Sequence, residues 1–186
     1  MSRGRSGHGQ CLALGCDECV EIRPRFRPQD EGAATVGFVP RVPRTSLPDG
    51  FFHIYCRGVA ARPVFPDGDD RTAFLTFARH CECRYRWTCH AICVMSTHYH
   101  VVLESTRERL SQGVHRLNWL YATYFNARYG SFGHVFAERF SARVIEGEER
   151  VFETCAYVLL NPVKARLCER VEDWPWSYSR YGLAVT

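Results

Sequence analysis

Two features that this sequence lacks limit what kind of protein it is. The 186 residues contain no run of 18 apolar residues, so no segment is predicted to span a membrane. Residues 1–9 also lack the apolar stretch of a secretory signal. We therefore expect a cytoplasmic protein with no membrane partner.

Lysine is also nearly absent. Lys164 is the only lysine among 24 basic residues, and the net charge is only +4. The guanidinium group of arginine binds phosphate through two hydrogen bonds and stacks on nucleobases. An arginine-dominated set of basic residues is thus consistent with a nucleic acid partner, while a codon bias toward arginine explains it equally well.

The ten cysteines form two groups. Seven lie in or beside apolar segments, where reduced thiols behave as small hydrophobic side chains: Cys56, Cys81, Cys83, Cys89, Cys93, Cys155 and Cys168. No disulfide framework is expected without an export signal. Cys11, Cys16 and Cys19 lie in a polar region and follow His8, a spacing that allows a small zinc or iron–sulfur site. No scaffold is apparent around them, and we favour an unstructured arm over a metal site.

The composition of the chain changes once along its length. Residues 1–45 are rich in glycine, arginine, proline and serine and show no period of a helix or a strand, so we predict a disordered basic arm. Residues 46–186 are long enough to bury one hydrophobic core and are predicted to form a single domain. No internal repeat is present.

Hydrophobic periodicity predicts seven elements in this domain. Strands are expected at residues 51–57, 85–95, 98–104 and 135–145, and helices at residues 67–80, 111–128 and 148 to about 161. The order β-α-β-β-α-β followed by a helix is the ferredoxin-like pattern with one addition. The fold class is therefore predicted to be α+β.

One predicted strand carries the triplet His98-Tyr99-His100. Successive side chains of a strand point to opposite faces, so the two histidines share a face and Tyr99 points to the other. Two imidazoles on one face can hold a metal ion if a third ligand comes from elsewhere. Two solvated histidines would give the same pattern, and the triplet alone does not decide between these interpretations.

A candidate nucleophile and a candidate third ligand lie in the last predicted helix. Glu153, Tyr157 and Asn161 are spaced four residues apart, so their side chains lie on successive turns of one face. Pro162 is expected to end the helix at or near Asn161. Taken singly, a tyrosine placed like Tyr157 is more often an aromatic side chain of the core, and an asparagine placed like Asn161 more often terminates a helix.

These segments together resemble a known family. Residues 52–58, 93–100, 133–140, 157–163 and 173–178 match, in the same order, the motifs of the single-tyrosine HUH transposases, and specifically the REP-associated tyrosine transposases. The family more often has Pro-Asn where this chain has Ser96-Thr97, a position that does not bind metal. The resemblance covers about residues 48–183 and supplies the main argument for an antiparallel ferredoxin-like sheet.

The resemblance implies roles for particular residues. His98, His100 and Asn161 would hold Mg²⁺ or Mn²⁺, and Tyr157 would attack a phosphodiester of single-stranded or hairpin DNA. A 5′-phosphotyrosine intermediate would then allow strand transfer. The resemblance also implies a bacterial, nucleoid-associated protein. Whether it acts as a monomer or a homodimer is left open.

Residues that flank the matched motifs are candidates for DNA binding: Arg57, Arg139, Arg143 and Lys164. Trp174 and Trp176 could stack on bases, but large aromatic side chains are mostly buried, so we expect them to pack the C-terminal segment onto the core. Two other functions remain open at this stage. One is a metal-dependent nuclease that uses water, and the other is a domesticated hairpin-binding protein without catalysis.

Overall fold

The computed structural model describes residues 48–137 and 139–182. The predicted basic arm, with Cys11, Cys16 and Cys19, lies outside these residues. The described elements, in chain order, are β1 (Gly50–Arg57), η2 (Val59–Ala61), α1 (Gly68–Tyr85), β2 (Thr88–Val94), β3 (His98–Ser105), α2 (Arg107–Tyr129), β4 (Ser141–Ile145), α3 (Glu148–Leu159), α4 (Asn161–Lys164), η3 (Val171–Asp173) and β5 (Ser177–Ser179). Among the described residues, no helix has both the length and the apolar character needed to cross a membrane.

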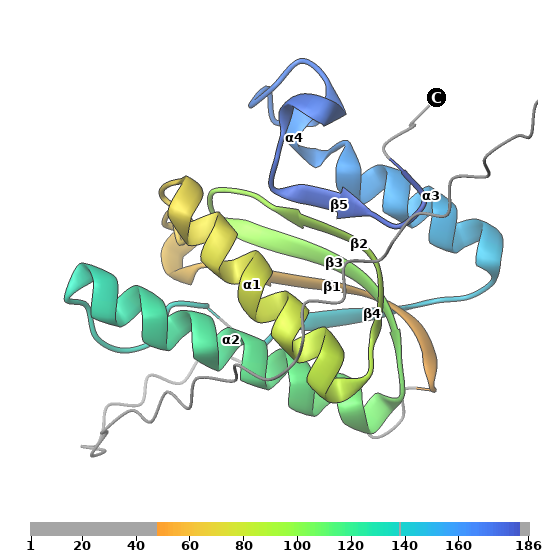
Figure 1. Ribbon diagram of the computed structural model, residues 1–186, viewed down its shortest axis with the longest axis horizontal. Coiled ribbons are helices and arrows are strands. Elements are labelled where there is room, and N and C mark those ends of the chain that lie inside the picture. Colours follow the sequence, from red (N-terminus) through yellow and green to blue (C-terminus); the bar gives the residue numbers. More distant parts are fainter. Residues whose placement is uncertain (1–47, 138, 183–186) are drawn as a thin grey trace, which may run out of the picture. The chain divides into compact units, whose positions relative to one another are not determined.

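The strands form one five-stranded antiparallel sheet in the order β4-β1-β3-β2-β5 (Figure 1). β1, β3 and β2 are therefore inner strands with a neighbour on both sides, and β3 is the central one. The elements from β1 to β4 follow the order β-α-β-β-α-β, with α3 added after them. The predicted ferredoxin-like α+β fold is confirmed.

The two faces of the sheet carry different layers. α1 and α2 lie side by side against one face, where Phe52, Ile54 and Tyr99 are fully buried (Figure 1). α3 packs on the other face, where its buried Val151 and Val158 join side chains of the sheet in a second, smaller core. Burial of each such side chain contributes roughly 1.5–3 kcal/mol, so α3 is held in place mainly by its apolar stripe.

α1 is longer than the sequence pattern predicted. Its expected end was residue 80, but it continues to Tyr85, and β2 begins only at Thr88. Cys81 is fully buried and extends the stripe of Phe74 by two helical turns, so packing on the core carries the helix onward. Arg86, with a left-handed φ of 52°, then ends the helix.

α2 begins earlier than predicted, at Arg107 rather than at residue 111. The side chain of Thr106 accepts a hydrogen bond from the backbone N–H of Arg109 and caps the first turn. A fully buried carboxylate, Asp70, ties the other end of α2 to the start of α1. It accepts hydrogen bonds from Arg128 at 2.7 Å and from the Tyr129 hydroxyl at 2.7 Å. This contact fixes how the two helices lie against each other.

The strand predicted at residues 135–145 is wrong in its first half. Only Ser141–Ile145 joins the sheet as β4. The neighbours Val135 and Phe136 are both buried, which the alternation of an edge strand does not produce. Instead, Phe136 forms an isolated bridge with Gly58, and this segment lies beside the end of β1.

The C-terminal part contains a strand that the sequence pattern did not predict. β5 has only three residues and pairs with β2. Trp174 before it is buried, and its indole N–H donates a hydrogen bond to the carbonyl oxygen of Val94 at 3.1 Å. The guanidinium of Arg71 lies 5.3 Å from the Trp174 ring centroid and 4.6 Å from that of Trp176. The expectation that the tryptophans pack this segment onto the core is confirmed.

α3 ends at Leu159, near the predicted position, and a second short helix, α4, follows after one residue. α4 starts at Asn161 with Pro162 in its first turn, a position where proline is tolerated. In the sequence, Val151, Phe152, Cys155, Val158 and Leu159 recur at helical spacing and predict a buried stripe on α3. Phe152 is instead 53% exposed and contacts the ring of Tyr181 at a centroid distance of 4.5 Å, so only the other four residues form the stripe.

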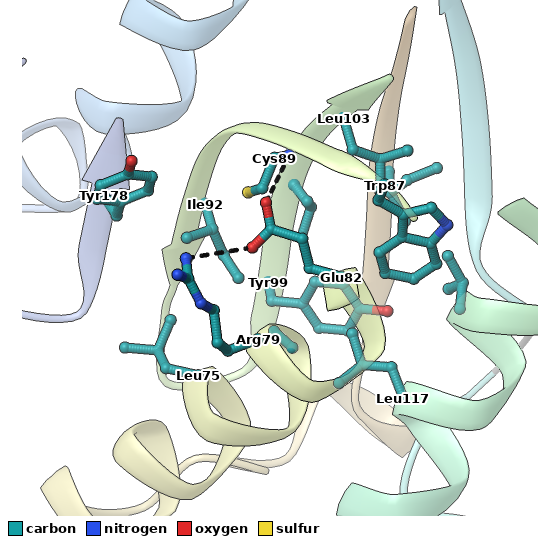
Figure 2. Close-up of a pocket in the computed structure, with 14 residues that line it drawn as sticks. Leu75, Arg79, Glu82, Trp87, Cys89, Ile92, Tyr99, Leu103, Leu117 and Tyr178 are labelled. Atoms are coloured by element: carbon teal, nitrogen blue, oxygen red, sulfur yellow. Dashed lines mark hydrogen bonds and ion pairs between the residues drawn. The ribbon is translucent and has the colours of Figure 1, made fainter. Parts of the chain in front are cut away.

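An apolar cavity of about 220 Å³ lies between the two helices and the sheet (Figure 2). Leu75, Tyr99 and Leu117 are among the side chains that line it, and at its edge Glu82 pairs with Arg79 at 3.5 Å. Glu82 also accepts a hydrogen bond from the backbone N–H of Cys89 at 3.0 Å. Because Tyr99 faces the cavity, it lies on the opposite side of the sheet from His98 and His100.

The described cysteines mostly follow the expectation for reduced thiols in apolar surroundings. Cys81, Cys93 and Cys155 are buried, and burial raises the pKa of the Cys81 and Cys93 thiols to about 12. Cys83 departs from the expectation because it is exposed. The buried thiols are protonated at neutral pH and pack as small apolar side chains.

Candidate active site

The candidate site is built on the inner strands of the sheet. In the register of β1 and β3, Tyr55 lies opposite His100, and Arg57 lies opposite His98. Residues directly opposite in an antiparallel pair share a face, and alternate residues of one strand do so as well. His53, Tyr55 and Arg57 of β1 therefore share the face of the two histidines.

His98 and His100 lie as the alternation of β3 predicted. Their ring centroids are 5.1 Å apart. Tyr99 between them is fully buried on the other face, where its hydroxyl donates a hydrogen bond to the side-chain oxygen of Asn118 at 2.7 Å. The strand thus separates a pair of polar side chains from a residue of the core.

The hydrogen bonds of the two rings leave the same nitrogen available in each. Nδ1 of His98 lies 2.9 Å from the Thr97 hydroxyl, and Nδ1 of His100 lies 2.9 Å from Nε2 of His53. Nε2 of His98 and of His100 can then serve as metal ligands, as imidazole nitrogens commonly do. The donor set fits a divalent transition metal or Mg²⁺ that also has oxygen ligands.

The three histidines are held in their neutral form. Burial, with smaller contributions from His53 and His98, lowers the pKa of His100 to about 3. Burial and the nearby Arg143 lower the pKa of His53 to about 4, and burial and Arg57 lower the pKa of His98. At neutral pH each ring therefore keeps the lone pair that binding a metal or accepting a hydrogen bond requires.

α3 brings Tyr157 to this face. The Tyr157 ring lies 6.1 Å from the ring of His53 and 6.1 Å from the ring of His100, measured between centroids. It is 45% exposed, so the side chain is accessible from solvent. The ammonium group of Lys164, from α4, lies 4.7 Å from the centroid of the same ring. The only lysine of the chain is thus placed against the candidate nucleophile.

The structure places Asn161 one turn after Tyr157, as predicted, and gives its amide a local contact. The side-chain NH₂ donates to the carbonyl oxygens of Tyr157 at 2.9 Å and Val158 at 3.2 Å. These bonds satisfy carbonyls at the end of α3 and leave the side-chain oxygen of Asn161 as the atom that could meet a metal. Its role as a ligand stays a prediction.

Among residues 48–137 and 139–182, no group of three or more histidine, cysteine, aspartate or glutamate side chains is arranged to hold a metal. A complete coordination sphere around His98 and His100 would therefore need other donors, such as an amide or phosphate oxygen.

An open groove of about 730 Å³ runs beside Tyr157. His53 and Tyr157 lie on it, together with Arg143 of β4 and Arg150 and Glu153 of α3. Two exposed arginines, Arg143 and Arg150, and two exposed glutamates, Glu146 and Glu153, line the groove, so it places charged side chains of both signs beside the candidate nucleophile.

The predicted DNA-binding residues are all exposed, but the structure groups only some of them. Arg57 and Arg143 lie on the histidine face of the sheet through their positions in β1 and β4, and Lys164 contacts Tyr157. Arg139 lies in the segment before β4. Its connection with the site stays a prediction.

The interpretation of the sequence missed His53 and Tyr55 as members of this group. The rings of Tyr55 and His100 are 5.0 Å apart, and those of His53 and His100 are 5.1 Å apart. The signal was present in the alternation of His53, Tyr55 and Arg57 with the apolar residues of β1. Only the pairing of β1 with β3 shows which partner this polar face meets.

A ferredoxin-like sheet with two histidines on an inner strand, faced by a tyrosine from a following helix, is the arrangement of a single-tyrosine transposase. The sequence profile described as IS200-like transposase matches residues 50–159, more than half of the chain, and the chain belongs to this family. The resemblance found in the sequence motifs is thereby confirmed. Membership places the chain among DNA-processing transposases.

A solved structure shows the same fold, and a second gives a weaker match. The structure of a REP-associated tyrosine transposase bound to a REP hairpin matches with a TM-score of 0.63 and 16% sequence identity, covering 75% of this chain and 82% of that one. A protein from Deinococcus radiodurans R1 matches with a TM-score of 0.45 and 12% identity, covering 62% of this chain and 93% of that one. No curated protein matches the sequence.

Proposed function

We propose that this protein cleaves and rejoins single-stranded DNA, with Tyr157 as the nucleophile. The observation that carries the proposal is the position of the Tyr157 ring, half exposed and 6.1 Å from the ring of His100. A tyrosine that only filled the core would be buried on the apolar side of α3. Here it lines an open groove together with His53, and its ring lies 6.1 Å from the rings of His53 and His100.

The reaction follows from the chemistry of a phenol and a phosphodiester. The Tyr157 oxygen forms a bond to phosphorus while the bond from phosphorus to the 3′ oxygen breaks. The products are a 5′-phosphotyrosine and a free 3′-OH, and the phenol proton balances the charge on the leaving oxygen. Because the covalent link keeps the energy of the broken bond, a second 3′-OH can reverse the step without ATP.

His98 and His100, with Asn161 as third ligand, would hold a divalent ion such as Mg²⁺ or Mn²⁺ in this site. When bound, such an ion neutralises the negative oxygens of the scissile phosphate. The neutral histidines suit this role, since protonated rings would have no lone pair to offer. Arg57 and Arg143 on the same face would attract neighbouring phosphates.

A folded single strand is the proposed substrate. The matching REP-associated tyrosine transposase is described in complex with a REP hairpin, and its fold is shared by this chain. The groove of about 730 Å³ beside Tyr157 is large enough for an unpaired segment next to such a hairpin. We therefore propose that the hairpin positions the strand and that the groove receives the unpaired nucleotides.

Two tyrosines near the histidines allow a matched experiment. Wild-type protein, Tyr157→Phe and Tyr55→Phe are incubated with single-stranded hairpins from the gene's own flanking DNA and Mn²⁺. Wild type and Tyr55→Phe should form an adduct that resists denaturation, whereas Tyr157→Phe should form none and still bind the hairpin. Cleavage by Tyr157→Phe would move the function to a nuclease that uses water.

A further inference from the structure

A third histidine lies in direct contact with the candidate metal pair. Nε2 of His53 is 2.9 Å from Nδ1 of His100, and the two rings are stacked with an interplanar angle of 21°. On its other side His100 meets the ring of Tyr55 at 5.0 Å. His100 is thus packed between two rings, and one of its nitrogens has a defined partner.

The direction of this hydrogen bond follows from the inventory of a neutral imidazole. Each ring has one N–H and one nitrogen lone pair. If Nε2 of His100 is to give its lone pair to a metal, the hydrogen must lie on Nδ1, and that N–H needs an acceptor. Nε2 of His53 is at the right distance to accept it, with the hydrogen of His53 on its own Nδ1.

We propose that His53 is a positioning residue for His100: by accepting the hydrogen bond from Nδ1, it holds His100 in the tautomer that leaves Nε2 free for the metal. This inference rests on the proposed function, because it assumes that His100 is a ligand. Metal-binding histidines commonly donate their second ring nitrogen to such an acceptor, and losing it weakens metal binding about 10–100-fold.

The comparison with His98 shows why His100 in particular needs this partner. Nδ1 of His98 meets the Thr97 hydroxyl, which can donate or accept by rotation, and His98 is only partly buried, so water can also reach it. His100 is almost fully buried, with 5% of its surface exposed, so water cannot readily replace a missing acceptor. The tautomer of His100 therefore depends on His53, whereas the tautomer of His98 does not.

Two substitutions separate the hydrogen bond from the space that the ring fills. His53→Gln places an amide oxygen near the position of Nε2 and keeps an acceptor, while His53→Leu fills space without one. In metal-free protein, ¹H–¹⁵N spectra of the histidine rings should show His100 with hydrogen on Nδ1 in the wild type and in His53→Gln. His53→Leu should show a mixture of tautomers.

Calorimetric titration with Mn²⁺ gives the second readout. We expect His53→Leu to bind Mn²⁺ about 10–100-fold more weakly than wild type, and His53→Gln to stay within a few-fold. Hydrogen on Nε2 of His100 in the metal-free wild type, or wild-type Mn²⁺ affinity in His53→Leu, would overturn the inference. The wild-type spectrum decides the question even if the Leu variant does not fold.

The same titrations distinguish failure of this inference from failure of the proposed function. If His98→Ala and His100→Ala lose Mn²⁺ binding and His53→Leu does not, only the role of His53 is wrong. If His98→Ala and His100→Ala both bind Mn²⁺ like the wild type, the metal site itself is wrong, and the role of His53 falls with it.

Discussion

Tyr99 and His98 are neighbours in the chain but face opposite sides of β3, so truncating each should have a different effect. Tyr99 is fully buried, and replacing a buried aromatic side chain by alanine typically costs about 3–5 kcal/mol. Its ring also borders the existing cavity of about 220 Å³, so the new space would merge with the old and could not easily collapse. The cost for Tyr99→Ala should therefore lie at the upper end of that range, near 5 kcal/mol.

The hydroxyl of Tyr99 can be tested by itself. Tyr99→Phe keeps the ring and removes the hydrogen bond to Asn118, which should cost roughly 1–2 kcal/mol because a partly buried amide oxygen loses its donor. Equilibrium unfolding in urea, followed by circular dichroism, measures the stability of Tyr99→Ala, Tyr99→Phe and His98→Ala on one scale. His98→Ala should change the free energy of unfolding by less than about 1 kcal/mol, since His98 is only partly buried and lies outside both hydrophobic cores.

These measurements can refute the reasoning in two ways. A cost below about 1.5 kcal/mol for Tyr99→Ala would mean that the ring is not part of the core. An equal loss of stability in His98→Ala would mean that the two side chains do not lie on different faces. Either result would remove the basis for placing His98 and His100 together.

Three further predictions concern other parts of the molecule. Gly113→Ala should destabilise the protein by about 1–3 kcal/mol in urea unfolding, because a Cβ atom would lie 2.1 Å from the Trp87 ring; a gain in stability would show that this helix contact is not so close. Lys164→Met should slow adduct formation about 2- to 5-fold, the rate equivalent of an exposed ammonium–aromatic contact worth ~0.5–1 kcal/mol, while Lys164→Arg should stay near wild type; an unchanged rate in the Met variant would contradict a role at Tyr157. Asn161→Ala should weaken Mn²⁺ binding about 10–100-fold in calorimetry, with cleavage partly rescued at high Mn²⁺; unchanged affinity would leave Asn161 with only its bonds at the end of α3.

The elements whose pattern is set by local chemistry could be predicted from the sequence. The alternation of His98, Tyr99 and His100 fixed their faces without knowledge of the rest of the fold. In the same way, the stripe of Val151 and Val158 defined α3 and left Tyr157 on another side of it. Both predictions needed only the period of a regular element.

The features that sequence reasoning missed depend on contacts between distant segments. His53 becomes part of the site only through the pairing of β1 with β3, which no local pattern shows. β5 has too few residues to display a period, and Phe152 contacts Tyr181 on the surface and does not enter the core. The length of α1 likewise follows from the burial of Cys81 and not from its own helix-ending signals.

The short strand β5 has a consequence for how the molecule avoids self-association. β2 carries Ala91, Ile92 and Cys93, all buried, and β5 pairs with these three residues along the outer side of the strand. Without that cover, an apolar strand edge with unpaired N–H and C=O groups would be open to pairing with a second chain. Trp174, through its bond to Val94, holds the cover in place. Loss of the segment after Asp173 would therefore expose a template for aggregation while leaving the histidine face of the sheet chemically complete.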